Sequence, residues 1–191
     1  DPSISEEDKK SYLERLNQYT DRLSILITDL FEVSKANSGN IDLEYSDINI
    51  IEFMEQVCAE NEELLQAKNL QLVTNLPEKE IHVCLDGNKT YRIFENLFTN
   101  ISKYALENTR VFLDVKDIGN SVLIIMKNTS KAPLDFDSDI TERFVRGDKS
   151  RHEAGSGLGL AIVKSFTEVQ NGTFMICLLY TSPSPRDGAT S

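Results

Sequence analysis

Two carboxamides and a lysine occupy one face of a helix that the sequence predicts from Asp86 to about Leu106. Asn96 and Asn100 are four residues apart and Lys103 follows three residues later, so their side chains are neighbours on the helix surface. Carboxamide oxygens can join the shell of a hydrated Mg²⁺ ion, and an ammonium can contact a phosphate. A solvated polar face would have the same composition, so this pattern needs support from other motifs.

A glycine-rich loop provides a second candidate site, one for an anion. Gly155, Gly157 and Gly159 alternate and precede or open an apolar helix predicted over residues 157–170. Glycines leave backbone N–H groups unobstructed, and a helix N-terminus favours a negative charge. The same spacing also occurs in flexible loops. It is not a dinucleotide fingerprint, because a long polar segment precedes it where that motif has a strand.

The polar segment before this loop contains Phe144 among charged residues. Glu142 and Arg143 precede the phenylalanine, and Arg146 follows it two residues later. A long segment in this position can act as a lid that becomes ordered around a ligand. A surface anchor without a ligand is the alternative interpretation of Phe144.

The N-terminal segment predicts one long helix from Ser5 to about Ala36, with Ser5 as the N-cap. A heptad seam is formed by Leu13, Leu16, Thr20, Leu23, Ile27 and Leu30. A second stripe at seven-residue spacing is formed by Tyr19, Leu26 and Val33. Two stripes favour burial in a helical bundle over packing of one amphipathic face on its own domain. The bundle partners must come from another chain or from sequence outside these residues.

The remaining chain predicts an α+β fold in which one mixed layer of strands is covered by helices on one face. The expected elements are a strand at Ile41–Tyr45, a helix from Asp47 to about Lys68, strands at 70–74 and 81–85 around the Pro77 turn, a hairpin of 111–115 and 121–126 across Gly119, and a strand from Thr173. We therefore expect a helix in residues 1–38 and a two-layer α/β sandwich in residues 39–176.

Composition excludes several classes of function. The formal net charge is −11, and such an acidic surface repels nucleic-acid backbones. Three cysteines without a spaced cluster fit neither a zinc site nor a disulfide framework. No apolar run approaches the length of a membrane span, and the chain begins without Met, so we expect a fragment of a longer protein.

In order and spacing, the motifs resemble those of the sensor histidine kinases of two-component systems. The stretch Asn96–Tyr104 resembles the N-box, Glu142–Phe144 the F-box, and residues 155–160 the second glycine box. The first helix resembles the second helix of that family's dimerisation and phosphotransfer hairpin. The resemblance covers about residues 5–175 and implies the histidine-kinase-like ATPase (GHKL or Bergerat) sandwich, preceded by a long dimerisation helix.

The resemblance also implies binding of ATP with Mg²⁺ and a role for each motif residue. Asn100 would coordinate the metal with Asn96 assisting, and Lys103 would contact phosphate. The other implied ATP-binding residues are Tyr104 beside the nucleotide, Asn128 at the adenine, Phe144 as lid anchor, Arg146 at phosphate, and Gly155, Gly157, Leu158 and Gly159 in the phosphate loop.

Two features depart from the family's pattern. The family's first glycine box, Asp-x-Gly-x-Gly, is matched by residues 128–132, where Asn128 is neutral and Ser130 and Ala132 replace the glycines. That loop must therefore follow another path. The second departure is that the phosphoacceptor histidine is missing. The two histidines present are His82, expected in a strand, and His152, expected in the lid, so neither is on a bundle helix.

The implied function is transfer of the ATP γ-phosphate to a histidine absent from this chain, for relay to an aspartate of a response regulator receiver domain. The implied parent is a homodimer through the complete hairpin, anchored in the bacterial cell membrane with this domain in the cytoplasm. The alternatives are another ATPase of the same fold, an anti-sigma serine kinase, or a degenerate domain that only dimerises and docks. The heptad helix joined directly to the domain favours the kinase.

The last residues interrupt the expected sheet. A Ser- and Pro-rich polar stretch, residues 181–191, stands where the strand from Thr173 should find its partner. We therefore expect residues 177–191 to be a non-native tail and the domain to be truncated, with a native disordered tail as the alternative.

Overall fold

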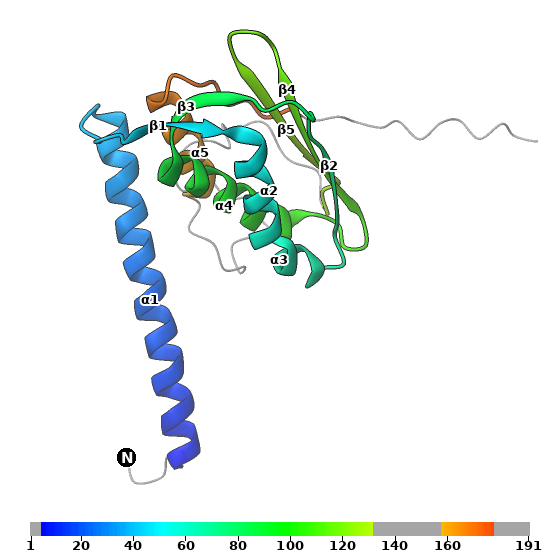
Figure 1. Ribbon diagram of the computed structural model, residues 1–191. Helices are drawn as coiled ribbons and strands as arrows, with labels where there is room; N and C mark the ends of the chain where they lie inside the picture. Colours follow the sequence, from blue (N-terminus) through cyan, green and yellow to red (C-terminus); the bar gives the residue numbers. More distant parts are fainter. Residues whose placement is uncertain (1–4, 132–157, 178–191) are drawn as a thin grey trace, which may run out of the picture.

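The computed structural model describes residues 5–131 and 158–177, which form one long helix followed by layered strands and helices (Figure 1). Several residues named above lie outside the described part of the chain: Phe144, Arg146, His152, Gly155, Gly157 and residues 178–191 of the expected tail.

Helix α1 (Glu6–Asn37) confirms the predicted N-terminal helix. Ser5 Oγ accepts a hydrogen bond from the Asp8 N–H at 3.0 Å, so the N-cap is as expected. The helix ends at Ser38, and Gly39 follows in the left-handed region with a φ of +70°, which glycine adopts without strain. Figure 1 shows the N-terminal half of α1 standing clear of the other elements.

The described strands are β1 (Tyr45–Asn49), β2 (Gln71–Asn75), β3 (His82–Asp86), β4 (Arg110–Asp117) and β5 (Val122–Asn128). They form a three-stranded sheet in the order β2-β4-β5 and a separate antiparallel pair of β1 with β3. The predicted hairpin is confirmed, because β4 and β5 are antiparallel across Gly119. The strands on either side of Pro77 do not pair with each other, since β2 runs parallel to β4.

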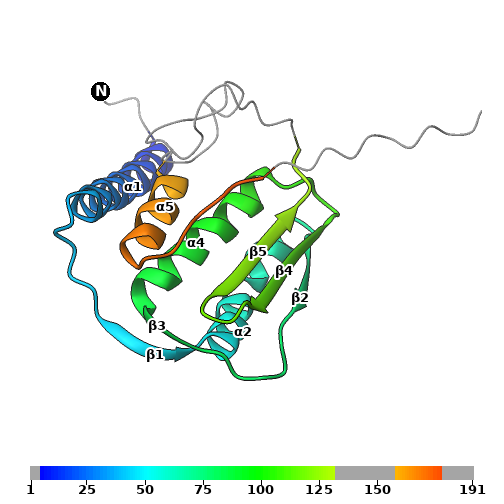
Figure 2. The ribbon, with the colours of Figure 1, turned by 90° about the horizontal axis from the view of Figure 1, so that it is seen from above.

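The described shorter helices are α2 (Ile50–Glu60), α3 (Glu62–Gln66), α4 (Gly87–Tyr104) and α5 (Gly159–Val169). Helices α2 and α4 cover one face of the three-stranded sheet (Figure 2). Met54 of α2, Phe98 of α4 and Leu113 of β4 are fully buried together in this layer. The two-layer α/β sandwich is therefore confirmed, with its strands divided between two sheets.

A second apolar cluster attaches α1 to the sandwich. Val33 and Ala36 of α1 are buried against Ile93 of α4 and against Ile162 and Phe166 of α5. The C-terminal half of α1 is thus packed on the domain, while large apolar side chains of its N-terminal half are exposed.

Three predicted details are wrong. The strand expected from Ile41 begins only at Tyr45, because Ile41 packs on the second cluster instead of pairing in a sheet. Asp47 does not cap a helix: it lies in β1, where its carboxylate is 3.1 Å from His82 Nδ1, and Asn49 caps α2 instead. Residues 172–177 are in neither a helix nor a strand, so the strand expected from Thr173 is not formed there.

Candidate functional site

Helix α4 carries the two predicted carboxamides and begins at a well-defined cap. Asp86 accepts a hydrogen bond from the Lys89 N–H at 2.9 Å, and its other carboxylate oxygen accepts one from the Glu44 N–H at 2.9 Å. The apolar face of α4 is buried in the sandwich core. Asn96 and Asn100 therefore lie on a helix whose orientation is set by both its cap and its packing.

Gly159, the first residue of α5, lies directly against both carboxamides. A Cβ atom on Gly159 would be 3.0 Å from Asn96 Oδ1 and 3.5 Å from Asn100 Nδ2. Only glycine brings the backbone of α5 this close to Asn96 without displacing its side chain, while the distance to Asn100 is an ordinary contact. The structure therefore unites the carboxamide motif with the last glycine of the loop motif.

Polar atoms of the two carboxamides remain available at this junction. Asn96 Nδ2 donates to the Arg92 carbonyl at 2.8 Å, while Asn96 Oδ1 lies on the side of Gly159. Asn100 Nδ2 is buried and has no hydrogen-bond partner among the described residues, an uncommon and costly condition in native proteins. A phosphate oxygen would satisfy this donor, and the carboxamide oxygens suit Mg²⁺. The residues present therefore fit a magnesium–phosphate group.

The N-terminal end of α5 adds a favourable electrostatic environment. No side chain of the described residues caps this end, so its first N–H groups and the helix dipole favour an anion beside Gly159. Leu158, also predicted for the site, is 1% exposed and packs in the second apolar cluster. Its side chain therefore anchors α5 in this cluster.

The last turn of α4 holds the other two predicted residues of the carboxamide motif. Lys103 is half-buried and Tyr104 is 36% exposed. The segment that replaces the first glycine box runs beside this turn: the Lys131 N–H donates to the Tyr104 carbonyl at 2.9 Å, and the Leu106 N–H donates to the Thr129 carbonyl at 2.8 Å. These two hydrogen bonds hold residues 129–131 against the end of α4.

Asn128 is the last residue of β5, where it pairs with Val111 of β4. It is exposed, and the pairing of the next residues with the end of α4 places its strand end near Tyr104. Asn128 makes no contact with Asn96 or Asn100 in the described part of the chain. A nucleotide that reached all three residues would have to span the distance between Asn128 and the two carboxamides of α4.

A charged cluster that the sequence motifs did not predict lies between α1 and α4. Arg92 Nη2 lies 2.5 Å from Asp29 Oδ1, Arg92 Nη1 lies 3.1 Å from Glu32 Oε2, and Lys89 Nζ lies 2.9 Å from Glu32 Oε1. Burial raises the pKa of Asp29, and the charge and hydrogen bond of Arg92 oppose that rise only in part. The signal in the sequence was the matched i,i+3 spacing of the two acids and of the two cations.

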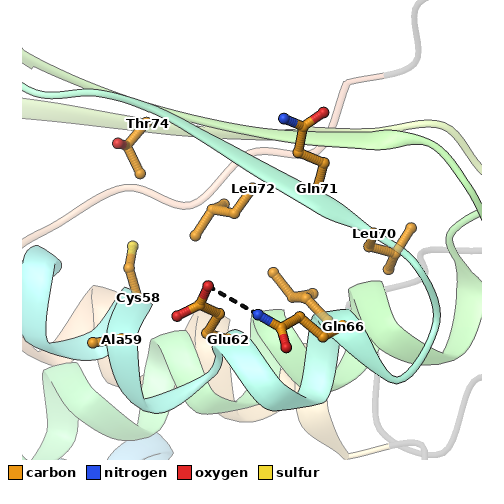
Figure 3. A pocket seen from close by; sticks show the side chains of 9 residues that line it. Cys58, Ala59, Glu62, Gln66, Leu70, Gln71, Leu72 and Thr74 are labelled. Atoms are coloured by element: carbon orange, nitrogen blue, oxygen red, sulfur yellow. Dashed lines mark hydrogen bonds between the residues drawn. The ribbon is translucent and has the colours of Figure 1, made fainter.

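A cavity of about 380 Å³ lies between α2, α3 and β2, away from these residues (Figure 3). Its walls include Cys58, Leu72 and Thr74, and Glu62 there accepts a hydrogen bond from Gln66 Nε2 at 3.0 Å. None of the residues predicted for the site lines this cavity. The described residues of the carboxamide and glycine-loop motifs meet instead at the α4–α5 junction.

Comparison with known proteins identifies the family of the chain. The family model described as histidine kinase-, DNA gyrase B-, and HSP90-like ATPase matches residues 85–190. The sensor protein kinase WalK of Staphylococcus aureus is 33% identical over 174 residues, which cover 87% of this chain and 41% of that protein. In the protein of strain NCTC 8325 the same match covers 28%. The chain thus spans less than half the length of these curated relatives.

Solved structures of lower identity share the fold. Full-length ShkA in complex with AMPPNP superposes with a TM-score of 0.73 at 22% identity, over 88% of this chain and 35% of that one. The histidine kinase AdeS of Acinetobacter baumannii has a TM-score of 0.64 at 18% identity, with 90% and 77% covered. The histidine kinase ThkA, solved with the response regulator TrrA, has a TM-score of 0.63 at 19% identity, with 88% and 47% covered. Within residues 5–131 and 158–177, no helix combines the length and the apolar character needed to cross a membrane.

Proposed function

The chain belongs to the histidine kinase-, DNA gyrase B-, and HSP90-like ATPase family, and we propose that it is the ATP-binding catalytic part of a two-component sensor histidine kinase. The observation that carries the proposal is the contact of Gly159 with Asn96 and Asn100, where a buried amide has no protein partner among the described residues. The relation to sensor protein kinases over most of the chain supports it.

In this function each residue of the junction has a defined task. Asn100, with Asn96 assisting, holds Mg²⁺, which when bound neutralises phosphate charge and orients the triphosphate. The Asn100 amide and the first N–H groups of α5 after Gly159 bind phosphate oxygens, and Lys103 supplies a positive charge beside them. Tyr104 packs on the nucleotide.

The remaining predicted residues complete the site as part of the proposal. Asn128 accepts a hydrogen bond from the adenine amino group. Phe144 anchors a lid, Arg146 contacts phosphate, and Gly155 and Gly157 let the loop backbone approach the triphosphate, although all four lie outside the described residues.

The reaction moves the γ-phosphoryl group from ATP to a histidine nitrogen, so one P–O bond breaks, one P–N bond forms and ADP leaves. The acceptor is expected outside these 191 residues. His82 lies in strand β3 and not on a helix of the hairpin, so it is not the acceptor proposed here. The phosphoryl group would then pass to an aspartate of a response regulator, a partner supported by the complex of the related ThkA.

The parent protein is proposed to be a homodimer through α1 and the helix that completes its hairpin. Leu13, Leu16 and Leu23 are 61%, 60% and 57% exposed on α1, as expected for a seam that needs partner helices. We also propose that this domain lies in the cytoplasm and that the parent is anchored in the bacterial cell membrane, in keeping with its sensor kinase relatives.

The deciding experiment is a calorimetric titration of the chain with ATP, with and without Mg²⁺. Asn100→Ala should remove most of the metal-dependent affinity, because the neighbouring Asn96 is proposed only to assist in holding Mg²⁺. Asn75→Ala, which changes an exposed asparagine of β2, is the matched control and should bind as the parent does. Equal affinity of Asn100→Ala and the parent would show that the site is wrongly placed. Absence of any nucleotide binding would favour the docking module instead.

A further inference from the structure

Strand β2 lies at the edge of the three-stranded sheet formed by the described residues. The Gln71 N–H donates to the Thr109 carbonyl at 3.0 Å, and in a parallel ladder alternate residues of a strand bond to the same neighbour. The backbone N–H and C=O groups of Leu72 and Thr74 therefore face away from β4. No backbone hydrogen bond joins these groups to any other residue in the described part of the chain.

This edge lacks the features that commonly prevent a further strand from pairing. Residues 71–75 include no charged residue and no proline, and each of them pairs in register with β4, so no bulge interrupts the strand. Edge strands usually carry charges, prolines or bulges that block such pairing. Pro77 follows only after β2 has ended. Strand β2 is therefore a regular template to which an extended segment can add.

The cavity of about 380 Å³ between α2, α3 and β2 lies beside this edge. Figure 3 shows Leu72 pointing from β2 toward the helices, while Gln71 points to the other side of the strand. The buried side chains of Leu65 and Leu70 also line the cavity. Alternate side chains of an added strand would face the helices as Leu72 does, so one of them could enter the cavity. In such complexes the main chain gives affinity and the pocket gives specificity.

The helices that form the other wall of the cavity are acidic. Residues 50–66 contain five glutamates and no lysine or arginine. Glu62 lines the cavity, and the charge of Glu55 adds to burial in raising the pKa of Cys58 to about 11. Negative potential therefore reaches the cavity wall, and it attracts a basic partner. A second copy of the chain would bring two acidic walls together, and pairing of two five-residue strands buries too little surface to offset that repulsion.

We propose that the edge of β2 binds an extended basic segment of another protein, which adds as a further strand and places an apolar side chain in the cavity beside α2 and α3. The main-chain groups of Leu72 and Thr74 pair with the segment, and Glu55 and Glu62 attract its lysine or arginine residues. This docking site is separate from the α4–α5 junction, and it does not depend on nucleotide binding at Gly159.

The probe is a synthetic fluorescent peptide of about ten residues, the length of a long strand, in which leucine or valine alternates with lysine or threonine. Its binding to the full chain is measured by fluorescence anisotropy. The matched control peptide has glutamate in place of each lysine and should bind at least about tenfold more weakly, because the acidic helices repel it. Two further peptides are N-methylated on complementary sets of alternate residues. One of them should lose binding and the other should keep it, because only one row of N–H groups faces β2.

Two variants of the chain test the edge and the cavity. Thr74→Pro removes an N–H that faces away from β4 and leaves the ladder to β4 intact, so peptide affinity should fall about tenfold or more. Ala59→Trp fills the cavity from an exposed position of α2 and should have a similar effect. Gln56→Trp, also exposed on α2 but not lining the cavity, is the matched control and should bind as the parent does.

A third variant tests the attraction of charge. Glu55→Gln with Glu62→Gln should lower peptide affinity several-fold and make it less dependent on salt. The control is Glu14→Gln with Asp21→Asn, which removes two exposed acids of α1 and should leave affinity unchanged.

Absence of saturable binding of the lysine peptide would overturn the proposal, as would equal affinity of Ala59→Trp and the parent. Binding by both N-methylated peptides would exclude strand addition. If the chain alone associates in sedimentation velocity and Thr74→Pro abolishes this, the occupant is a second copy and the proposed partner is wrong. If Thr74→Pro fails to fold, Ala59→Trp decides, because its position is exposed. ATP titration of the same variants reports on the proposed function independently.

Discussion

Gly159 of α5 and Asn96 of α4 approach so closely that a methyl group on the glycine would lie 3.0 Å from the asparagine Oδ1. Gly159→Ala should therefore push the Asn96 carboxamide out of its rotamer, which costs about 0.5–1.5 kcal/mol. We expect ATP–Mg²⁺ affinity to fall roughly three- to tenfold. The melting temperature should change little, because alanine is favoured over glycine in helices by about 0.5–1 kcal/mol and offsets the strain.

The control for this substitution is Gly87→Ala. Gly87 is likewise the first residue of its helix, and its Cβ would meet only Ile48 Cδ1 at 3.4 Å, an ordinary contact. Titration calorimetry and thermal melts of both variants separate site geometry from helix stability. Loss of affinity in Gly87→Ala, or none in Gly159→Ala, would contradict the role of Gly159.

Asn128→Asp should tighten ATP binding, and Asn128→Ala should weaken it. A carboxylate accepts a hydrogen bond from the adenine amino group more strongly than a carboxamide does, by about 1 kcal/mol. The change lies at the exposed end of β5, so the fold should tolerate it. ATP affinities of the two variants check this, and two values equal to that of the parent would place the adenine elsewhere.

The chain alone should form no phosphohistidine. The proposed acceptor lies on a helix that these residues do not include, together with the adjacent acid that would take the imidazole proton. Radiolabelled ATP should leave no acid-labile phosphate on the chain, whereas addition of the missing hairpin helix should allow transfer. Asn100→Ala should abolish that transfer. Acid-labile label on the isolated chain would refute the assignment of the acceptor.

The three thiols should differ in reactivity. Cys58 is buried and its pKa is raised to about 11, first by burial and then by the charge of Glu55, while Cys84 and Cys177 are exposed. At pH 8 only about one Cys58 thiol in a thousand is ionised, and the thiolate is the reactive form. Alkylation followed by mass spectrometry should modify Cys58 at least about 100-fold more slowly than the others. In denaturant the three rates should converge, and fast modification of native Cys58 would mean that α2 opens readily.

Local sequence determined the elements whose signals are local. Ser5 and Asp86 were recognisable as helix caps, and Gly119 as the turn of a hairpin, because capping and tight turns depend on residues within one turn of chain. The same kind of reasoning misled at Ile41 and Asp47. Alternation of apolar residues marks any half-buried extended segment, and a carboxylate can pair across strands as well as cap a helix.

That Asn96 and Asn100 share a helix face also follows from their spacing, because the helical period brings residues four apart to one side. The contacts of Gly159 with that face and of Arg92 with Asp29 depend on how distant helices pack in the folded chain. Spacing within a helix gives the direction in which each side chain points from the axis of that helix. It contains no information on which face of a distant helix will pack there, because that depends on the combined shape of the buried surfaces.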